Sequence, residues 1–248
     1  KSGSSKSSNH QIGTRSNVKI VPKTLHYVVT AVGERFSPQI GSIEKLSELM
    51  KKPTGCGEQN MYYMSFNLYT MMYLDKIGRL SPQLRERGVR YLKRGLAQAL
   101  NFRKENGSFA TFYKRDPSVW LTGFVVKVLC QSAPYITHEM DIKIVVSALK
   151  WLKSHQDSST GAWRETKPIH HERALGGVSG SKALTAYLTI AFSECRHYLN
   201  RYQSDNSDID FEDIIQKAHD YILKSDYQVD SGDPFISALT AYSLTFSE

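Results

Sequence analysis

The feature that most restricts the fold of this chain is an apolar helical segment that occurs three times. The copies read WLTGFVVKVL from Trp120, KALTAYLTIAF from Lys182 and SALTAYSLTF from Ser237, and each contains a Leu-Thr pair. A more polar helix and a loop precede each copy, which gives a period of roughly 50 to 60 residues, typical of an array of helical hairpins. Because the three helices are apolar nearly all round, we expect them to form an inner ring. The sequence therefore predicts an all-α fold, an α/α toroid of helical hairpins, with an open helical solenoid as the alternative.

Start and stop signals divide the rest of the chain into further helices. Apolar residues recur at helical spacing from Ser42 until Pro53 interrupts them, and a long apolar helix follows from about Glu58 to Lys76. The predicted helix starts after that are Ser81-Pro82, Asp116-Pro117, Thr137, Asp210 and Asp233-Pro234. The helices expected in the second half of the chain include 181–199, 211–224 and 234–248. Residues 18–32 give the only convincing strand signal.

Two loops resemble each other in the same way as the helices. Asn106-Gly-Ser-Phe109 and Thr160-Gly-Ala-Trp163 each place a glycine shortly before an aromatic residue of the type that is buried. The first loop is also an N-glycosylation sequon, so Asn106 is a candidate glycosylation site in a secreted protein.

The positive charge of the chain does not by itself indicate nucleic acid as a partner. The formal net charge is +8 and the pI is about 9.3, but basic residues are interspersed with acids, as in Arg85-Glu86-Arg87, and form no long block. We therefore expect a mildly basic solvated surface and no nucleic acid, while weak attraction to anionic cell surfaces stays open. No apolar run approaches the roughly 20 residues of a membrane-spanning helix, so we expect no membrane insertion.

The segment TGCGEQN carries the clearest chemical signal in the chain. A cysteine and a glutamine three residues apart, with glycine on both sides of the cysteine, permit a tight turn that brings the sulfur to the side-chain carbonyl. Loss of ammonia would leave an internal thioester, which is far more electrophilic than an amide because a thiolate leaves more easily than an amine. The turn also opens a helix, whose positive end favours a released thiolate. We interpret Cys56 and Gln59 as the reactive pair, supported by Gly55, Gly57 and Glu58.

The chain has three cysteines, and an odd number leaves one of them unpaired. If Cys56 has the chemistry described above, Cys130 and Cys195 remain for one disulfide, although spacing alone does not establish the bond. The alternative for Cys56 is a free thiol in a glycine turn at the start of a helix.

The string GCGEQNM resembles the signature of the alpha-2-macroglobulin and complement thioester family. The resemblance extends to FATFYKRDPSVWLTGFVVKVL from Phe109, SALKWL from Ser147 and PIHHERALGG from Pro168, and covers most of residues 43–248. It implies the α/α toroid of that family for residues 42–248, without its last helices, in a secreted, extracellular protein. It also implies that residues 1–41 are a flexible lead and a strand connector from a neighbouring CUB-type domain.

The resemblance implies a second reactive position in the segment PIHHE. In family members that transfer to hydroxyls, a histidine here attacks the thioester, which leaves an acyl-imidazole on the Gln59 carbonyl and a Cys56 thiolate that acts as general base. We assign this role to His170. His171 is the alternative because the loop has one residue more than the family pattern, and Glu172 would orient the imidazole. Two adjacent histidines without a third ligand make a poor zinc site, so we expect no metal and no cofactor.

The resemblance predicts a complement-like opsonin domain of innate immunity that attaches covalently to target surfaces. After proteolytic activation of the parent protein, acyl transfer would join the domain to carbohydrate or protein hydroxyls. Each molecule would react once, so the domain is not an enzyme that turns over. The expected partners are the target surface, neighbouring domains of the parent protein, the activating protease, and a receptor or regulator.

Three other functions fit parts of the sequence. A protease-trapping inhibitor of the same family would react with amines, although His170 and the KRDPSVWLT stretch favour transfer to hydroxyls. A spent thioester fragment would act as a receptor-binding module. An α/α-toroid enzyme would need paired acids or a metal triad in its central funnel, whereas Asp208, Asp210, Glu212 and Asp213 follow the usual capping pattern of a helix start.

Overall fold

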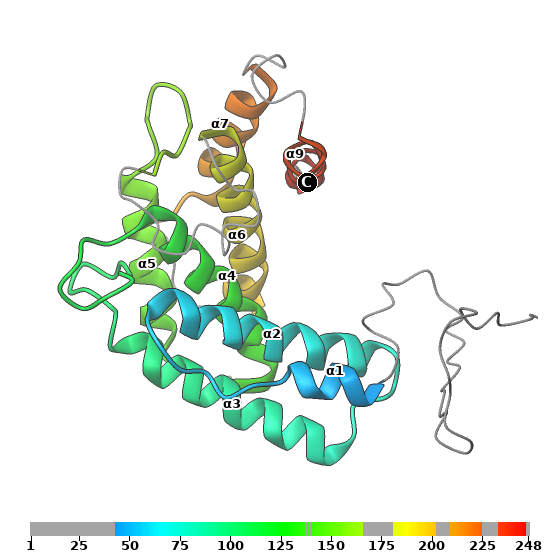
Figure 1. Cartoon of the computed structure of the whole chain (residues 1–248). Helices are drawn as coiled ribbons and strands as arrows, with labels where there is room; N and C mark the ends of the chain where they lie inside the picture. Colours follow the sequence, from blue (N-terminus) through cyan, green and yellow to red (C-terminus); the bar gives the residue numbers. More distant parts are fainter. Residues whose placement is uncertain are drawn as a thin grey trace, which may run out of the picture. The chain divides into compact units, whose positions relative to one another are not determined.

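The structure is a computed structural model that describes residues 43–136, 138, 140–165, 181–201, 209–224 and 233–246 (Figure 1). In these ranges the chain forms eight helices, and its extended pairing is one isolated antiparallel bridge between Arg103 and Phe109. The described chain is therefore all-α, as predicted. The strands expected at 18–32 and the connector expected at 1–41 lie outside the described residues.

The helices follow the predicted order. They are α1 (Ile43–Leu49), α2 (Gly57–Lys76), α3 (Pro82–Leu100), α4 (Val119–Ile136), α5 (Ile142–Ser154), α6 (Ser181–Arg201), α7 (Phe211–Lys224) and α9 (Pro234–Leu244). Three predicted N-caps are confirmed by side chains that accept backbone hydrogen bonds at the helix starts. Ser81 Oγ accepts from Leu84 N at 3.3 Å, Asp210 Oδ1 from Asp213 N at 3.0 Å, and Asp233 Oδ1 from Phe235 N at 2.8 Å.

Two helix starts differ from the prediction because another polar side chain supplies the cap. α4 begins at Val119 rather than at Asp116-Pro117, since Ser118 Oγ accepts from the backbone N–H of Leu121 at 3.0 Å. α5 begins at Ile142 rather than after Thr137, since Asp141 Oδ1 accepts from the backbone N–H of Lys143 at 2.9 Å. In both cases the N-cap lies immediately before the helix.

The helices form two layers. α2, α4, α6 and α9 contact one another in that order along an inner layer, while α3, α5 and α7 pack outside on α2, α4 and α6 respectively. Figure 1 shows α2 beside α3 and α6 beside α7. This alternation of inner and outer helices is the arrangement of an α/α toroid. The three repeated apolar segments lie on α4, α6 and α9. The predicted inner position is confirmed for α4 and α6, whereas most of α9 is exposed in the described chain.

α4 is apolar over most of its surface because α2, α3, α5 and α6 all contact it. By length and composition this helix would suffice to cross a membrane, so the expectation that no apolar run reaches that length is wrong. However, 72% of the helix is buried inside the fold. Its hydrophobicity is therefore explained by its position in the core.

The Leu-Thr pairs hold two loops to the inner helices. The Thr122 hydroxyl donates to the carbonyl four residues earlier at 2.7 Å and accepts from the backbone N–H of Phe109 at 3.0 Å. Thr185 makes the same two bonds, at 2.6 Å to the carbonyl four residues earlier and at 3.0 Å from the backbone N–H of Trp163. Both aromatic side chains are fully buried. The two loops that resemble each other in sequence are thus bound to the core in the same way.

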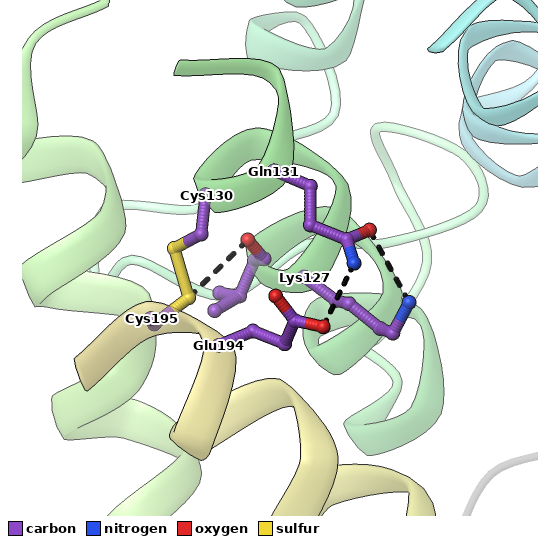
Figure 2. Close-up of a disulfide and its surroundings, with 6 residues drawn as sticks. Lys127, Cys130, Gln131, Glu194 and Cys195 are labelled. Carbon is purple, nitrogen blue, oxygen red and sulfur yellow. Dashed lines mark hydrogen bonds between the residues drawn. A yellow bond between two sulfur atoms is a disulfide. The ribbon is translucent and has the colours of Figure 1, made fainter. Parts of the chain in front are cut away.

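A disulfide joins the inner helices α4 and α6. Cys130 and Cys195 are 65 residues apart in sequence, their Cα atoms lie 5.3 Å apart, and both side chains are buried (Figure 2). Beside the disulfide, Lys127 Nζ donates to Gln131 Oε1 at 3.3 Å, and Gln131 Nε2 donates to Glu194 Oε1 of α6 at 3.0 Å. The covalent bond and the polar chain together fix α4 against α6.

We expect replacement of both cysteines, Cys130→Ala with Cys195→Ala, to lower the free energy of unfolding by about 4 kcal/mol, because a closed loop of this length restricts the unfolded chain. Urea unfolding followed by circular dichroism measures the difference from the wild type. Lys153→Ala, at an exposed position of α5, is the control and should change the midpoint little. Equal midpoints for the double variant and the wild type would contradict the prediction.

Candidate functional site

Cys56 is the residue that immediately precedes α2. Its backbone is extended, with φ −73° and ψ 175°, and its carbonyl accepts the first helical hydrogen bond, from Asn60 N–H at 2.9 Å. Gly55 has φ +88°, a left-handed conformation that glycine adopts without steric cost. The Cys56 side chain is buried, with 8% of its surface exposed. The predicted glycine turn therefore places a shielded sulfur at the N-terminus of a 20-residue helix.

Gln59 folds back toward Cys56. Its side-chain oxygen Oε1 accepts a hydrogen bond from the backbone N–H of Cys56 at 3.3 Å, and the Cys56 side chain faces the backbone N–H of Gln59. This reciprocal arrangement is a capping box. A Cβ atom at position 55 would lie 2.1 Å from Gln59 Oε1, so Gly55 leaves the space that the glutamine carbonyl occupies. The structure thus brings together the two groups that the sequence predicted to react.

Two distant segments hold this turn in place. The Gly57 N–H donates to Thr111 O at 2.9 Å, and a Cβ atom at position 57 would lie 2.6 Å from Ala110 O. The loop after α3 therefore approaches so closely that a side chain at position 57 would collide with it. In addition, Gln98 Nε2 of α3 donates to Gly55 O at 2.9 Å. The sequence motif did not reveal Thr111 or Gln98, because neither is near the turn in sequence.

The polar residues at the start of α2 are buried. Glu58 is 1% exposed, and its Oε1 accepts from the Thr111 hydroxyl at 2.6 Å. Asn60 is fully buried, and its Nδ2 donates to Gly95 O of α3 at 2.9 Å. Both side chains tie the first turn of α2 to its neighbours and so position the reactive pair. Asn60 was not predicted as a site residue, although a polar residue inside an apolar helix was the signal that could have identified it.

The two histidines and the glutamate predicted at 170–172 lie outside the described residues. The described chain stops before them at Glu165 and resumes at Ser181, where α6 begins. Ser181 Oγ donates to Trp163 O at 2.8 Å. This hydrogen bond joins the described residues that precede the segment to those that follow it.

Glu165 is anchored close to the reactive turn. Its Oε2 accepts from the Ser118 hydroxyl at 2.7 Å and from the Trp120 N–H at 2.9 Å, so it caps the N-terminus of α4 together with Ser118. The next residue of that helix, Leu121, has a methyl group 3.4 Å from where a Cβ atom of residue 57 would lie. The Leu121 side chain therefore lies between the N-terminus of α4, which Glu165 caps, and the turn at Gly57.

The remaining predicted residues have separate places in the structure. Asn106 is exposed, and its Oδ1 accepts from the backbone N–H and the hydroxyl of Ser108 at 3.1 Å and 2.6 Å. Of the acids at 208–213, Asp210 caps α7, while Glu212 and Asp213 form ion pairs with Arg196 and Lys217, and position 208 lies outside the described residues. Within the described ranges, no three His, Cys, Asp or Glu side chains are placed to hold a metal ion.

We expect Thr111→Val to lower the free energy of unfolding by about 1 to 3 kcal/mol, because it leaves the buried Glu58 side chain without its hydroxyl donor. Thr111→Ser keeps the hydroxyl and should lose less, even though it removes a buried methyl group. Urea unfolding of the two variants beside the wild type makes the comparison. A larger loss for the serine variant than for the valine variant would show that packing, and not the hydrogen bond, fixes the turn.

Comparison with known proteins agrees with this geometry. Residues 27–248 match the family model of the A-macroglobulin TED domain. The chain is 37% identical over 209 residues to a venom factor of Crotalus adamanteus, and 32% identical over 206 and 216 residues to complement C3 of Eptatretus burgeri and of Lethenteron camtschaticum. These alignments cover 81%, 81% and 83% of this chain, which spans 12% of the length of each relative. The family match over most of the chain, together with the helical layers and the Cys56–Gln59 turn, shows that the chain belongs to the A-macroglobulin TED domain family and is a complement-like thioester domain with the α/α-toroid fold.

Proposed function

We propose that Cys56 and Gln59 form an internal thioester, and that the domain uses it to attach covalently to hydroxyl groups on target surfaces, as a complement-like opsonin. The observation that carries the proposal is the position of the Gln59 side-chain carbonyl against Cys56 at the start of α2. The contacts from α3 and from the loop after it hold both residues in this position before any reaction. Such preorganisation favours a reaction between two side chains of the same turn.

Formation of the thioester needs only these two side chains. The Cys56 sulfur attacks the side-chain carbonyl carbon of Gln59, the carbon–nitrogen bond breaks, and the nitrogen leaves as ammonia with the thiol proton. The product is a thioester, in which the Cys56 sulfur is bonded to the side-chain acyl carbon of Gln59. The Cys56 side chain is buried but Gln59 is exposed, so protection of the acyl carbon from water depends on a neighbouring domain that covers it.

Transfer to a target takes two further steps. The imidazole of His170 attacks the thioester carbonyl carbon, the carbon–sulfur bond breaks, and the Cys56 sulfur leaves as a thiolate. The thiolate then takes the proton of a target hydroxyl, whose oxygen attacks the acyl-imidazole and releases the imidazole. An ester joins the Gln59 carbonyl to the target, and Cys56 is left as a free thiol. The N-terminus of α2 stabilises the thiolate between these steps.

The anchoring of Glu165 supports a nucleophile from the segment that follows it. Residue 170 comes five positions after Glu165, and five extended residues span at most about 18 Å. Glu165 is bound at the N-terminus of α4, which contacts the reactive turn through Leu121. We propose that a histidine of this segment reaches the turn. We retain His170 as the nucleophile, with His171 as the alternative and Glu172 as the residue that orients the imidazole.

The activity of the whole parent protein forms part of the same proposal. In the parent, which we place outside the cell, neighbouring domains would shield the thioester until a protease activates it. Residues 42–248 would supply the thioester domain, and residues 1–41 a connector to a CUB-type neighbour. The thioester is consumed on transfer, so each molecule acts once, and the attached domain then presents a surface to a receptor or regulator.

Mass spectrometry of the peptide that contains Cys56 and Gln59 tests the thioester in the freshly purified full-length protein. We expect this peptide to be lighter than its sequence mass by one ammonia, and we expect methylamine to add to it while a titratable thiol is released. Cys56→Ala protein is the control, because it cannot form the bond. An unmodified glutamine beside a free cysteine in untreated protein would contradict the covalent mechanism. Glutamate at position 59 would identify a hydrolysed thioester and assign the preparation a recognition role.

Two acceptors separate hydroxyl transfer from the amine reaction of a protease trap. We expect His170→Ala to reduce incorporation of radiolabelled glycerol by at least about 100-fold, because general acid–base and nucleophilic assistance are lost, while methylamine still reacts. His171→Ala tests the alternative nucleophile, and His155→Ala, an exposed histidine after α5, is the matched control. If glycerol incorporation survives in both the 170 and 171 variants, the histidine mechanism is wrong.

A further inference from the structure

An open groove of about 570 Å³ runs along the loop between α3 and α4, where residues 103–106 and 113–117 line it. Four of the lining side chains are basic and two are acidic. The basic ones are Arg103, Lys104, Lys114 and Arg115, and the acidic ones are Glu105 and Asp116. These six side chains together give the groove a net positive charge.

Two of these basic side chains are available to a ligand. Lys114 and Arg115 are exposed, and neither forms an ion pair within the described chain. Some other exposed basic residues are paired, for example Arg85 with Asp75 at 2.8 Å. An exposed cation without a protein partner loses little when it binds an anion.

Arg103 adds a third positive charge to the lining of the groove. Its Nη2 donates to Ser147 Oγ of α5 at 2.9 Å, which fixes the guanidinium. Its Nε is buried and has no hydrogen-bond partner among the described residues. Because the Nε atom is buried, Arg103 contributes its positive charge to the wall of the groove rather than this donor.

Tyr113 adds an aromatic surface to the charged groove. It is 70% exposed, more than any other large hydrophobic residue of the described chain. Lys104 Nζ lies 5.3 Å from the centre of its ring and donates to its backbone carbonyl, so a cation and the ring are held together. An aromatic face packs well against the C–H face of a sugar ring, and the adjacent ammonium binds a sulfate or carboxylate on the same sugar.

The groove and the reactive turn share one loop. Thr111 accepts the hydrogen bond of Gly57, and Tyr113 follows two residues later, a separation of at most about 7 Å along the chain. The Gln59 side chain, which would carry the acyl group, is exposed. A sugar chain that occupied the groove would place its neighbouring hydroxyls close to the thioester carbonyl.

We propose that this groove binds acidic polysaccharides of target surfaces, sulfated or carboxylated, before acyl transfer. The proposal rests on the proposed function and specifies the substrate class that the thioester meets. The anionic groups bind without reacting, and an uncharged hydroxyl of the same polysaccharide accepts the acyl group in the steps given above. Anionic lipid headgroups present the same charge, but they lack the ring faces that Tyr113 would contact.

Covalent deposition of the activated full-length protein on beads tests the proposal. The beads carry dextran sulfate or neutral dextran, which share a sugar backbone with reactive hydroxyls and differ in charge. We expect Lys114→Gln with Arg115→Gln to reduce deposition on dextran sulfate by about tenfold, which corresponds to about 1.4 kcal/mol of binding. Deposition on neutral dextran and incorporation of glycerol should not change. The loss should also shrink at high salt, because screening weakens the charge contacts.

Matched variants distinguish this site from general charge effects. Lys143→Gln with Lys153→Gln removes the same two charges from exposed positions of α5 and should leave deposition unchanged. Tyr113→Ala should weaken deposition on dextran sulfate while it keeps all four cations. The protein is treated with an endoglycosidase before the assay, because Asn106 also lines the groove and a glycan there would occupy it.

Three results would overturn the proposal. The first is an equal loss of deposition on dextran sulfate and on neutral dextran when Lys114 and Arg115 are replaced. The second is an equal loss of deposition when Lys143 and Lys153 of α5 are replaced instead. The third is deposition that depends on Lys114 and Arg115 with phosphatidylserine vesicles but not with dextran sulfate. Failure of the thioester itself is recognised separately, since wild-type protein would then incorporate no glycerol. In that case noncovalent binding of the Cys56→Ala protein to dextran sulfate still tests the groove, with and without the Lys114 and Arg115 substitutions.

Discussion

The reactive turn is joined to the loop between α3 and α4 by a backbone hydrogen bond, from Gly57 N–H to Thr111 O. Each side of that bond is fixed by a different part of the fold. Gly57 begins α2, whereas the loop of Thr111 is tied to α4 through the Phe109 N–H and the Thr122 hydroxyl. The packing of two inner helices therefore sets the position of a turn only a few residues long. This explains why glycine occupies position 57, since a side chain there would push the loop and the helix apart.

The loop between α3 and α4 has two chemically different sides. The Ala110 carbonyl lies close to Gly57, and the Thr111 hydroxyl donates to the buried Glu58 carboxylate. Lys114 and Arg115, a few residues on, extend into solvent. The groups that stabilise the turn are thus buried, whereas the side chains that a target would contact are exposed. A change to the exposed side need not disturb the buried side, so the acceptor preference of such a domain is free to vary while its reactive turn stays the same.

Sequence alone predicted the parts of this structure that depend on local patterns. Apolar residues at helical spacing predicted the helices, and the nearly all-round apolarity of the repeated segments predicted the inner positions of α4 and α6. Cys56 and Gln59 were recognisable because a capping turn joins residues close in sequence. By contrast, the predicted start of α4 at Asp116-Pro117 was wrong. Ser118 caps this helix together with Glu165, which lies 47 residues from Ser118 in the sequence. Thr111, Gln98 and the buried role of Asn60 were missed for the same reason, since their partners come from distant segments. The predicted histidines stay untested by the described residues.

The position of the disulfide has a consequence for the sulfur chemistry of the domain. The proposed reaction passes through a thiolate at Cys56 in a protein that also contains an oxidised cysteine pair. Thiolates attack disulfides wherever the sulfur atoms can meet, and the crosslink would then be exchanged or lost. Cys130 lies nine residues beyond Leu121 on α4, about 13 Å along the helix axis, and both of its disulfide sulfurs are buried. The length of α4 between Leu121 and Cys130 and the burial of the disulfide keep the Cys56 thiolate away from the disulfide sulfurs. The bond that joins α4 to α6 therefore outlasts the reaction that consumes the thioester.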